Sequence, residues 1–169
     1  MTNNLSLTEY SPAHRRACAK LFHKVYNAPP FEYGWLDSVK ADMYFLDLES
    51  MPNALSYILT DGENIVGACM GQKEAHFENP LYRINEFFIE PERQHMGLGT
   101  FFINELEGKL KQMGLKSMNL FTQRNMGSYA FYRKNDFIPS DETVHMARAI
   151  RQEPTVLYAR TFINGEEPD

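Results

Sequence analysis

The residues best suited to chemistry lie in a loop with two glycines, between a run of apolar residues and a long amphipathic helix. The loop has the spacing Gln94-x-x-Gly97-x-Gly99. The first N–H groups of a helix have no partners within it, and the helix dipole adds partial positive charge there. Because glycine has no side chain to obstruct a ligand, this loop is predicted to bind an anion, most suitably a phosphate or pyrophosphate.

Two familiar phosphate-binding motifs do not fit this loop. The sequence contains no GxxxxGK[ST] run, which excludes a Walker A loop. The dinucleotide motif GxGxxG would need a third glycine where Phe102 stands. A turn in which the glycines only shape the backbone stays an alternative.

A second informative segment, residues 125–137, follows about thirty positions later and reads Asn-Met-Gly-Ser-Tyr-Ala-Phe-Tyr-Arg-Lys-Asn-Asp-Phe. Together, the glycine loop and this segment resemble the two signatures of the GNAT superfamily of acyl-CoA-dependent N-acetyltransferases. Ser128 stands where the family usually has alanine, and Asp136 where it usually has glycine. Both replacements are small or compatible with a tight turn.

The resemblance implies acetyl-CoA as co-substrate and no metal. In the family the pyrophosphate lies on the main chain of the glycine loop, and the pantetheine arm pairs with the preceding strand. An N–H group of that strand would stabilise the charge that develops on the acetyl oxygen. Asn125 is expected to hold the arm or to orient the loop after the fifth strand. The loop and strand residues concerned are Gln94, His95, Met96, Gly97, Leu98, Gly99, Thr100, Phe87, Phe88 and Ile89.

Tyr132 matches the family tyrosine that protonates or hydrogen-bonds the departing CoA thiolate. An aromatic residue that only packs against the core would also suit this position. The two cysteines, Cys18 and Cys69, lie outside both segments. Their position agrees with direct attack of an amine on the thioester rather than with a covalent enzyme intermediate.

Glu86 is the candidate for the base that takes the proton of the amine. An alkylammonium has a pKa of about 10 and no free lone pair, so it must lose a proton before or during attack. Strand alternation predicts Glu86 on one face with Ile84 and Phe88, beside the expected reaction point. Alternatively, Glu86 would bind the cationic group of the substrate or a neighbouring backbone group. Glu74 and Glu78 are weaker candidates for the base.

The acceptor side is predicted in residues 27–35, which in the family overhang the site. Phe31, Glu32, Tyr33 and Trp35 combine aromatic rings with a carboxylate. Aromatic faces and carboxylates both favour a cation, so a small amine such as a polyamine or an aminoglycoside is the predicted acceptor. The alternative is a hydrophobic plug in which Phe31 and Trp35 only cover the core.

Composition limits the classes of partner. The chain has 169 residues, with 17 Lys and Arg against 22 Asp and Glu and a net charge of −5. This balance argues against binding to nucleic acid, and no apolar run is long enough to indicate a membrane partner. The sequence shows no metal-ligand spacing and no secretory signal. It therefore predicts a cytoplasmic protein without a metal, and leaves a homodimer open.

The elements that position these residues follow from the spacing of apolar side chains. Alternation predicts strands over residues 5–10, 55–59, 65–74, 82–89, 117–121, 137 and 144–150, with 155–163 as a strand or a docked tail. Helical spacing predicts helices over residues 13–26, 36–50, 97–113 and 126–134. The apolar face of the helix at 36–50 is predicted to carry Leu36, Val39, Met43 and Leu46.

This order of elements predicts a mixed α+β fold in a single domain over residues 1–169. The resemblance further implies the GNAT acyl-CoA N-acyltransferase fold, with a mixed, mostly antiparallel sheet of about six or seven strands flanked by about four helices.

The predicted function is that of an N-acetyltransferase, which moves acetyl from acetyl-CoA to a primary amine of a small molecule by direct attack. Two alternatives stay open: a non-catalytic sensor that binds acyl-CoA, and an enzyme that acetylates an amine of a protein or peptide. Tyr132 argues against the sensor, because a pure binder does not need a group that assists a leaving thiolate.

Overall fold

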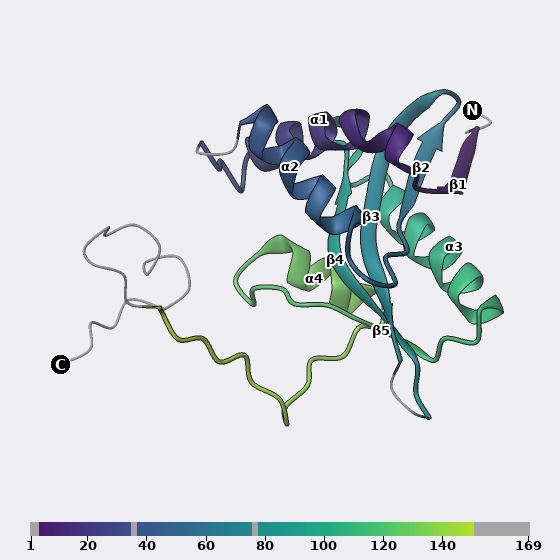
Figure 1. Cartoon of the computed structure of the whole chain (residues 1–169), viewed down its shortest axis with the longest axis vertical. Coiled ribbons are helices and arrows are strands. Elements are labelled where there is room, and N and C mark those ends of the chain that lie inside the picture. Colours follow the sequence, from purple (N-terminus) through teal and green to yellow (C-terminus); the bar gives the residue numbers. More distant parts are fainter. Residues whose placement is uncertain (1–3, 35–36, 76–77, 151–169) are drawn as a thin grey trace. The chain divides into compact units, whose positions relative to one another are not determined.

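A computed structural model describes residues 4–34, 37–75 and 78–150. Within these residues, five strands form one sheet in the order β1-β2-β3-β4-β5 (Figure 1). The strands are β1 (Leu5–Glu9), β2 (Tyr57–Asp61), β3 (Asn64–Glu74), β4 (Leu81–Ile89) and β5 (Ser117–Asn119). The helices are α1 (Arg15–Tyr26), α2 (Ser38–Glu49), α3 (Leu98–Gln112) and α4 (Gly127–Lys134). The predicted mixed α+β fold is confirmed.

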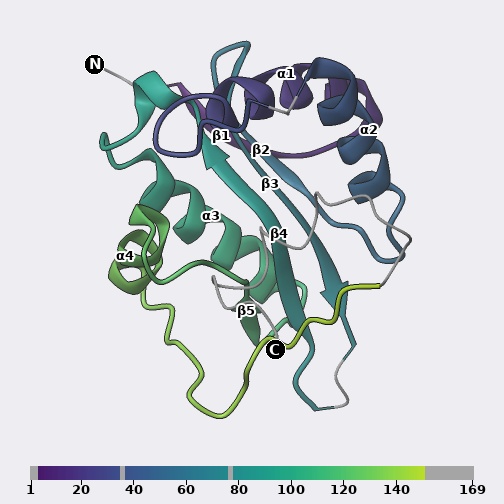
Figure 2. The same ribbon diagram turned by 90° about the vertical axis from the view of Figure 1, so that its left-hand side faces the viewer.

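The sheet separates two helical layers. Helices α1 and α2 cover one face, while α3 and α4 lie on the other (Figures 1 and 2). Each layer has its own apolar core, because every helix turns one stripe of apolar side chains towards the sheet. The core under α3 includes Tyr57, Tyr82, Phe102 and Leu106. The core under α1 and α2 includes Phe22, Phe45, Met70 and Phe88.

The sheet is antiparallel from β1 to β4, and β5 joins it parallel to β4. In the described residues β5 pairs with β4 over three positions, the last of which is Arg83 with Asn119. From Ile84 to Ile89, the main chain of β4 therefore has no strand of the described residues beside it on that side. This open stretch follows directly on the paired one.

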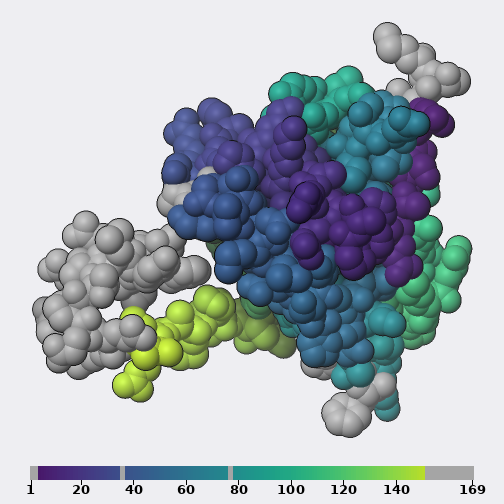
Figure 3. All heavy atoms as spheres, turned by 45° about the horizontal axis from the view of Figure 1, so that its top comes forward, coloured from purple at the N-terminus to yellow at the C-terminus, as the bar shows by residue number. Residues whose placement is uncertain are grey.

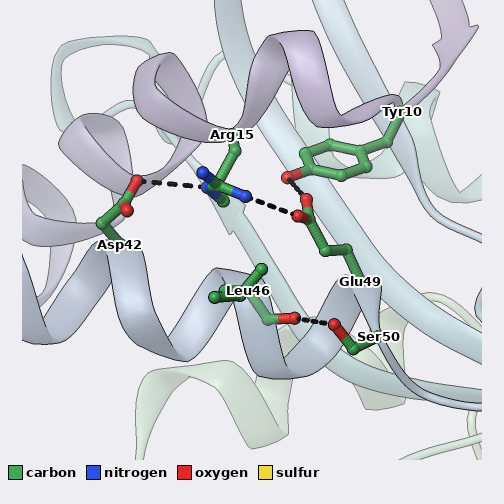
Figure 4. Close-up of polar contacts among 6 residues, drawn as sticks. All are labelled: Tyr10, Arg15, Asp42, Leu46, Glu49 and Ser50. Atoms are coloured by element: carbon green, nitrogen blue, oxygen red, sulfur yellow. Dashed lines mark hydrogen bonds and ion pairs between the residues drawn. The ribbon is translucent and has the colours of Figure 1, made fainter.

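A polar network fixes α2 against the start of α1 (Figure 4). The Tyr10 hydroxyl donates to Glu49 Oε2 over 2.7 Å, and Arg15 Nη1 lies 2.7 Å from Glu49 Oε1. Arg15 Nε also lies 3.4 Å from Asp42 Oδ1. The two helices adjoin on one face of the molecule, as the purple and blue spheres of Figure 3 show. The network therefore holds the two helices in register over the sheet.

The apolar face predicted for α2 is wrong. Val39 and Met43 are 65% and 61% exposed, and Leu46 is also exposed, whereas Leu36 lies outside the described residues. The helix instead buries Ala41, Phe45 and Leu48. Both sets have helical spacing, and the one with the aromatic ring is buried because Phe45 removes more apolar area from water.

The strands predicted at residues 137 and 144–150 are also wrong. The structure divides into a unit over Met1–Phe137 and a unit over Ile138–Asp169, and residues 138–150 form no helix or strand. Val144, Met146 and Ile150 are exposed. An alternating pattern gives a strand only where a partner strand is available. The described sheet thus has five strands instead of six or seven. The strand or docked tail predicted at residues 155–163 lies outside the described residues.

No helix in the described ranges is both long and apolar enough to cross a membrane.

Candidate active site

A β-bulge decides which way the side chains of β4 point. The pairing of β4 with β3 skips one residue, Asn85, between Ile84 and Glu86. Ile84 packs in the core under α3, whereas Phe88 packs in the core under α1 and α2. Glu86 points to the α1 and α2 side with Phe88, so the prediction that it shares a face with Ile84 is wrong. The extra residue reverses the alternation at this point.

Two tyrosines from different helices hold the Glu86 carboxylate. Tyr26 near the end of α1 donates to Oε2 over 2.8 Å, and Tyr44 on α2 donates to Oε1 over 2.6 Å. Burial raises the pKa of Glu86, and the two hydrogen bonds lower it in part. The tyrosines are 60 and 42 residues from Glu86 in the sequence. No local pattern in the sequence indicates either of them.

The alternative bases are placed differently. Glu74 forms an ion pair with Arg83 through two contacts, one of them 2.9 Å between Arg83 Nη2 and Glu74 Oε2. A carboxylate that already neutralises a guanidinium is a weak proton acceptor. Glu78 is exposed. Of the three, Glu86 alone is both partly buried and without a cationic partner among the described residues.

Tyr132 lies on α4 in an aromatic cluster. Its ring centroid is 6.4 Å from that of Phe87 and 5.3 Å from that of Phe137. Burial raises the pKa of Tyr132, and the nearby Cys69 and Glu86 raise it further. The phenol is therefore neutral and able to donate a hydrogen bond, on the opposite side of β4's open main chain from the tyrosines that hold Glu86.

The glycine loop is tied to the end of β4. Gln94 Nε2 donates to the carbonyl oxygen of Ile89 over 3.0 Å. His95 and Gly97 both have left-handed backbone conformations, with φ values of 61° and 85°. At Gly97, the residue before α3, a β-carbon would be strained in this conformation. The loop thus starts at the end of the open stretch of β4 and ends at a helix N-terminus.

The start of α3 has free N–H groups and a tightly packed second glycine. The Phe101 N–H bonds to the Gly97 carbonyl over 3.0 Å, so the three N–H groups between these residues have no acceptor within the helix. A β-carbon at Gly99 would approach Phe131 Cε2 to 2.9 Å. Gly99 is therefore required by the packing of α3 on α4, whereas a β-carbon at Gly97 would meet nothing within 4 Å.

The predicted acceptor residues fall into two groups. Phe31 and Tyr33 pack on the ring of Tyr26, with centroid distances of 4.7 and 5.7 Å. They are partly buried against the core, so they cover Tyr26 and, through it, adjoin Glu86. Glu32 is exposed, and Trp35 lies outside the described residues. Asn125, which was predicted for the pantetheine arm and not for the acceptor, is exposed in the loop between β5 and α4.

The described residues contain no group of three or more His, Cys, Asp or Glu side chains that would hold a metal ion. The described part of the site consists of one partly buried carboxylate, three phenols, the open stretch of β4 and a helix N-terminus.

Comparison with known proteins identifies the family and the fold. The profile of the acetyltransferase (GNAT) family matches residues 22–137, more than half of the chain. No curated protein matches the chain by sequence.

Three solved structures of acetyltransferases are similar in fold. An aminoglycoside acetyltransferase from an uncultured soil metagenomic sample, in complex with sisomicin, has a TM-score of 0.67 at 17% identity, over 88% of this chain and 98% of that one. A ribosomal-protein-alanine N-acetyltransferase from Brucella melitensis biovar Abortus 2308 has a TM-score of 0.68 at 13% identity, over 86% and 99%. An aminoglycoside N-acetyltransferase in complex with CoA has a TM-score of 0.65 at 12% identity, over 86% and 95%. These likenesses show the fold, and the match over residues 22–137 shows the family. The chain is an acyltransferase that belongs to the acetyltransferase (GNAT) family.

Proposed function

We propose that the protein transfers the acetyl group of acetyl-CoA to a primary amine of a small cationic molecule, by direct attack at the open stretch of β4. The observation that carries this proposal is the placement of Glu86. It is a partly buried carboxylate without a cationic partner, and it lies where, among the described residues, no strand adjoins β4 on the β5 side. Tyr132 is close enough to interact with its charge. A proton acceptor, Glu86, and a hydrogen-bond donor, Tyr132, thus lie on either side of the open stretch of β4.

The residues present fit acetyl-CoA. The free N–H groups at the start of α3 and the open space at Gly97 suit a pyrophosphate. The unpaired main chain from Phe87 to Ile89 would pair with the pantetheine arm, as a strand pairs with a sheet edge. A similar fold is known in complex with CoA. Acetyl-CoA supplies the activated thioester.

The chain's own groups would move the proton and stabilise the leaving group. Glu86 would accept the proton that the amine loses. Tyr132 would donate a hydrogen bond to the thiolate, because its raised pKa makes full proton transfer to a thiolate unfavourable. Of the two roles that the resemblance implies for this tyrosine, the structure favours the hydrogen bond.

Substitution of Gly99 tests the binding of acetyl-CoA. We expect Gly99→Val to weaken acetyl-CoA binding by about tenfold or more, since the displaced α3 start would no longer match the pyrophosphate. The clash with Phe131 should also lower the free energy of unfolding by about 1–3 kcal/mol. Calorimetry and thermal unfolding measure the two effects. Gly108→Val in the same helix, where a β-carbon meets nothing within 4 Å, is the control and should bind as the wild type does.

The choice of acceptor rests on charge and on the similar folds. Enzymes of similar fold include aminoglycoside acetyltransferases, one of them in complex with sisomicin. In this chain the exposed Glu32 stands in the sequence between Phe31 and Tyr33, whose rings cover Tyr26. Such an arrangement favours a cationic amine over an anionic one.

A panel of amines tests this choice. We expect polyamines and aminoglycosides to be acetylated faster than free amino acids or lysine peptides. Glu32→Gln should raise KM for the cationic acceptors by about two- to fivefold, the size typical of an exposed ion pair, with little change in kcat. Steady-state thiol release measures both. A preference for a neutral or anionic amine that Glu32→Gln leaves unchanged would rule out this acceptor class.

The proposed function itself is tested by comparing binding with turnover. We expect acetyl-CoA to bind and to release its thiol in the presence of at least one amine of the panel. Tight binding of acetyl-CoA without thiol release for any amine would identify a sensor instead.

A further inference from the structure

We propose that Tyr26 and Tyr44 are positioning residues, which aim the Glu86 carboxylate at the acceptor amine and hold it in its ionised form. This inference rests on the proposed role of Glu86 as the proton acceptor. Neither tyrosine belongs to the two sequence signatures.

Tyr26 and Tyr44 form a clamp, which holds the Glu86 carboxylate from two sides. One carboxylate oxygen of Glu86 accepts from Tyr26 on α1, and the other accepts from Tyr44 on α2. The side chain of Glu86 comes from β4, so three separate elements meet at this carboxylate. With both oxygens held at 2.8 and 2.6 Å, the carboxylate is fixed in rotation as well as in position.

The two tyrosine rings are themselves held by a shared aromatic neighbour. Phe22 on α1 lies 4.3 Å from the ring of Tyr26 and 5.6 Å from the ring of Tyr44, centroid to centroid. Phe22 also contacts Phe88, the next residue of β4 on the same face as Glu86. The clamp is therefore part of the packed core under α1 and α2.

The charges around Glu86 explain why neutral donors are needed. Tyr26 on α1 and Tyr44 on α2 face Glu86 and bond to it. Tyr132 on α4 and Cys69 on β3 lie on the other side of the sheet but are near enough to interact with its charge. In the described part of the chain, no Lys, Arg or His pairs with Glu86. Burial alone would favour the protonated carboxyl, and the two phenols oppose this because they donate to the ionised form.

Neutral donors also leave the negative charge of Glu86 available. An ion pair such as that of Glu74 with Arg83 would neutralise the carboxylate and occupy the place of the amine. Two hydroxyl donors stabilise the charge without cancelling it. The carboxylate can then attract an ammonium group and still accept its proton.

The two donors differ in their access to water, which predicts a graded effect. Tyr44 and its bond to Glu86 are exposed, whereas Tyr26 is less exposed and is covered by Phe31 and Tyr33. Water can replace the lost hydroxyl of Tyr44 more readily than that of Tyr26. Tyr26→Phe should therefore raise the pKa of Glu86 more than Tyr44→Phe does.

The test is a carbon-13 NMR titration of the Glu86 carboxyl, assigned by comparison with Glu86→Gln. We expect Tyr26→Phe to raise this pKa by about one pH unit, Tyr44→Phe by less, and the double variant by more than either. The matched control is Tyr10→Phe, which removes a tyrosine–carboxylate bond of the same kind, 2.7 Å to Glu49, from the same helical layer. It should leave the Glu86 titration unchanged.

The same variants are then followed in the pH profile of acetyl transfer, whose acid limb should move upward by the same amount. An unchanged carboxyl titration in both single variants would overturn the clamp, whether or not the protein is active. A shifted titration without a matching shift of the acid limb would keep the clamp, but would overturn the proposed role of Glu86 and with it the positioning role of the tyrosines. The NMR measurement needs no substrate, so failure of the clamp and failure of the proposed function are told apart.

Discussion

Tyr132→Phe is expected to lower the turnover number by about 100-fold or more, because a hydrogen bond to developing charge is made only in the transition state. The aromatic contacts with Phe87 and Phe137 remain in the variant. Acetyl-CoA binding should therefore change little, and kcat and kcat/KM for acetyl-CoA should fall together. Steady-state kinetics and calorimetry measure these quantities.

The matched control for this prediction is Tyr129→Phe. Tyr129 lies on the same short helix, where its ring faces Arg124. We expect this variant to keep the wild-type turnover. An unchanged turnover number in Tyr132→Phe would show instead that Tyr132 only packs in the aromatic cluster.

Glu86→Gln is expected to lower the rate at neutral pH by about 10²–10⁴-fold, the range typical of general base catalysis. In the wild type, the rate should fall as the pH falls through the raised pKa of Glu86, because a protonated carboxyl cannot accept the proton of the amine. The variant should lack this acid limb. Its rate should recover in part at high pH, as the amine approaches its own pKa of about 10.

The pH dependence of the ratio between variant and wild-type rates decides the role of Glu86. A constant ratio from about pH 6.5 to 9.5 would contradict a role as base. Glu74→Gln is the matched control, because Glu74 lies on the neighbouring strand but pairs with Arg83. We expect it to retain the rate and the acid limb.

The parts of the site that depend on local sequence were predictable. The loop from Gln94 to Gly99 combines glycine spacing with the start of a strongly amphipathic helix, and α3 buries Leu98, Phe102 and Leu106 along one face. Both features follow from neighbouring residues alone. The match of residues 22–137 to the acetyltransferase (GNAT) family confirms the resemblance that these segments carry.

The parts that depend on distant contacts were not predictable from one sequence. Nothing in residues 82–89 marks Asn85 as the extra residue of a bulge, although it alone sets the direction of Glu86. The bonds from Tyr26 and Tyr44 join residues far apart in the chain. On α2, two apolar stripes compete for burial, and packing against α1 and β3 selects one of them.

The central claim is that an amine attacks acetyl-CoA directly at the open stretch of β4. A single-turnover experiment with acetyl-labelled acetyl-CoA and a large amount of protein tests it most directly. Without an amine, we predict no thiol release and no acetyl group on the protein. With a polyamine or aminoglycoside, the label should appear on the amine in step with thiol release. Thiol release and acetylation of the protein in the absence of amine would contradict direct transfer, and the absence of release with every amine would contradict the enzyme activity itself.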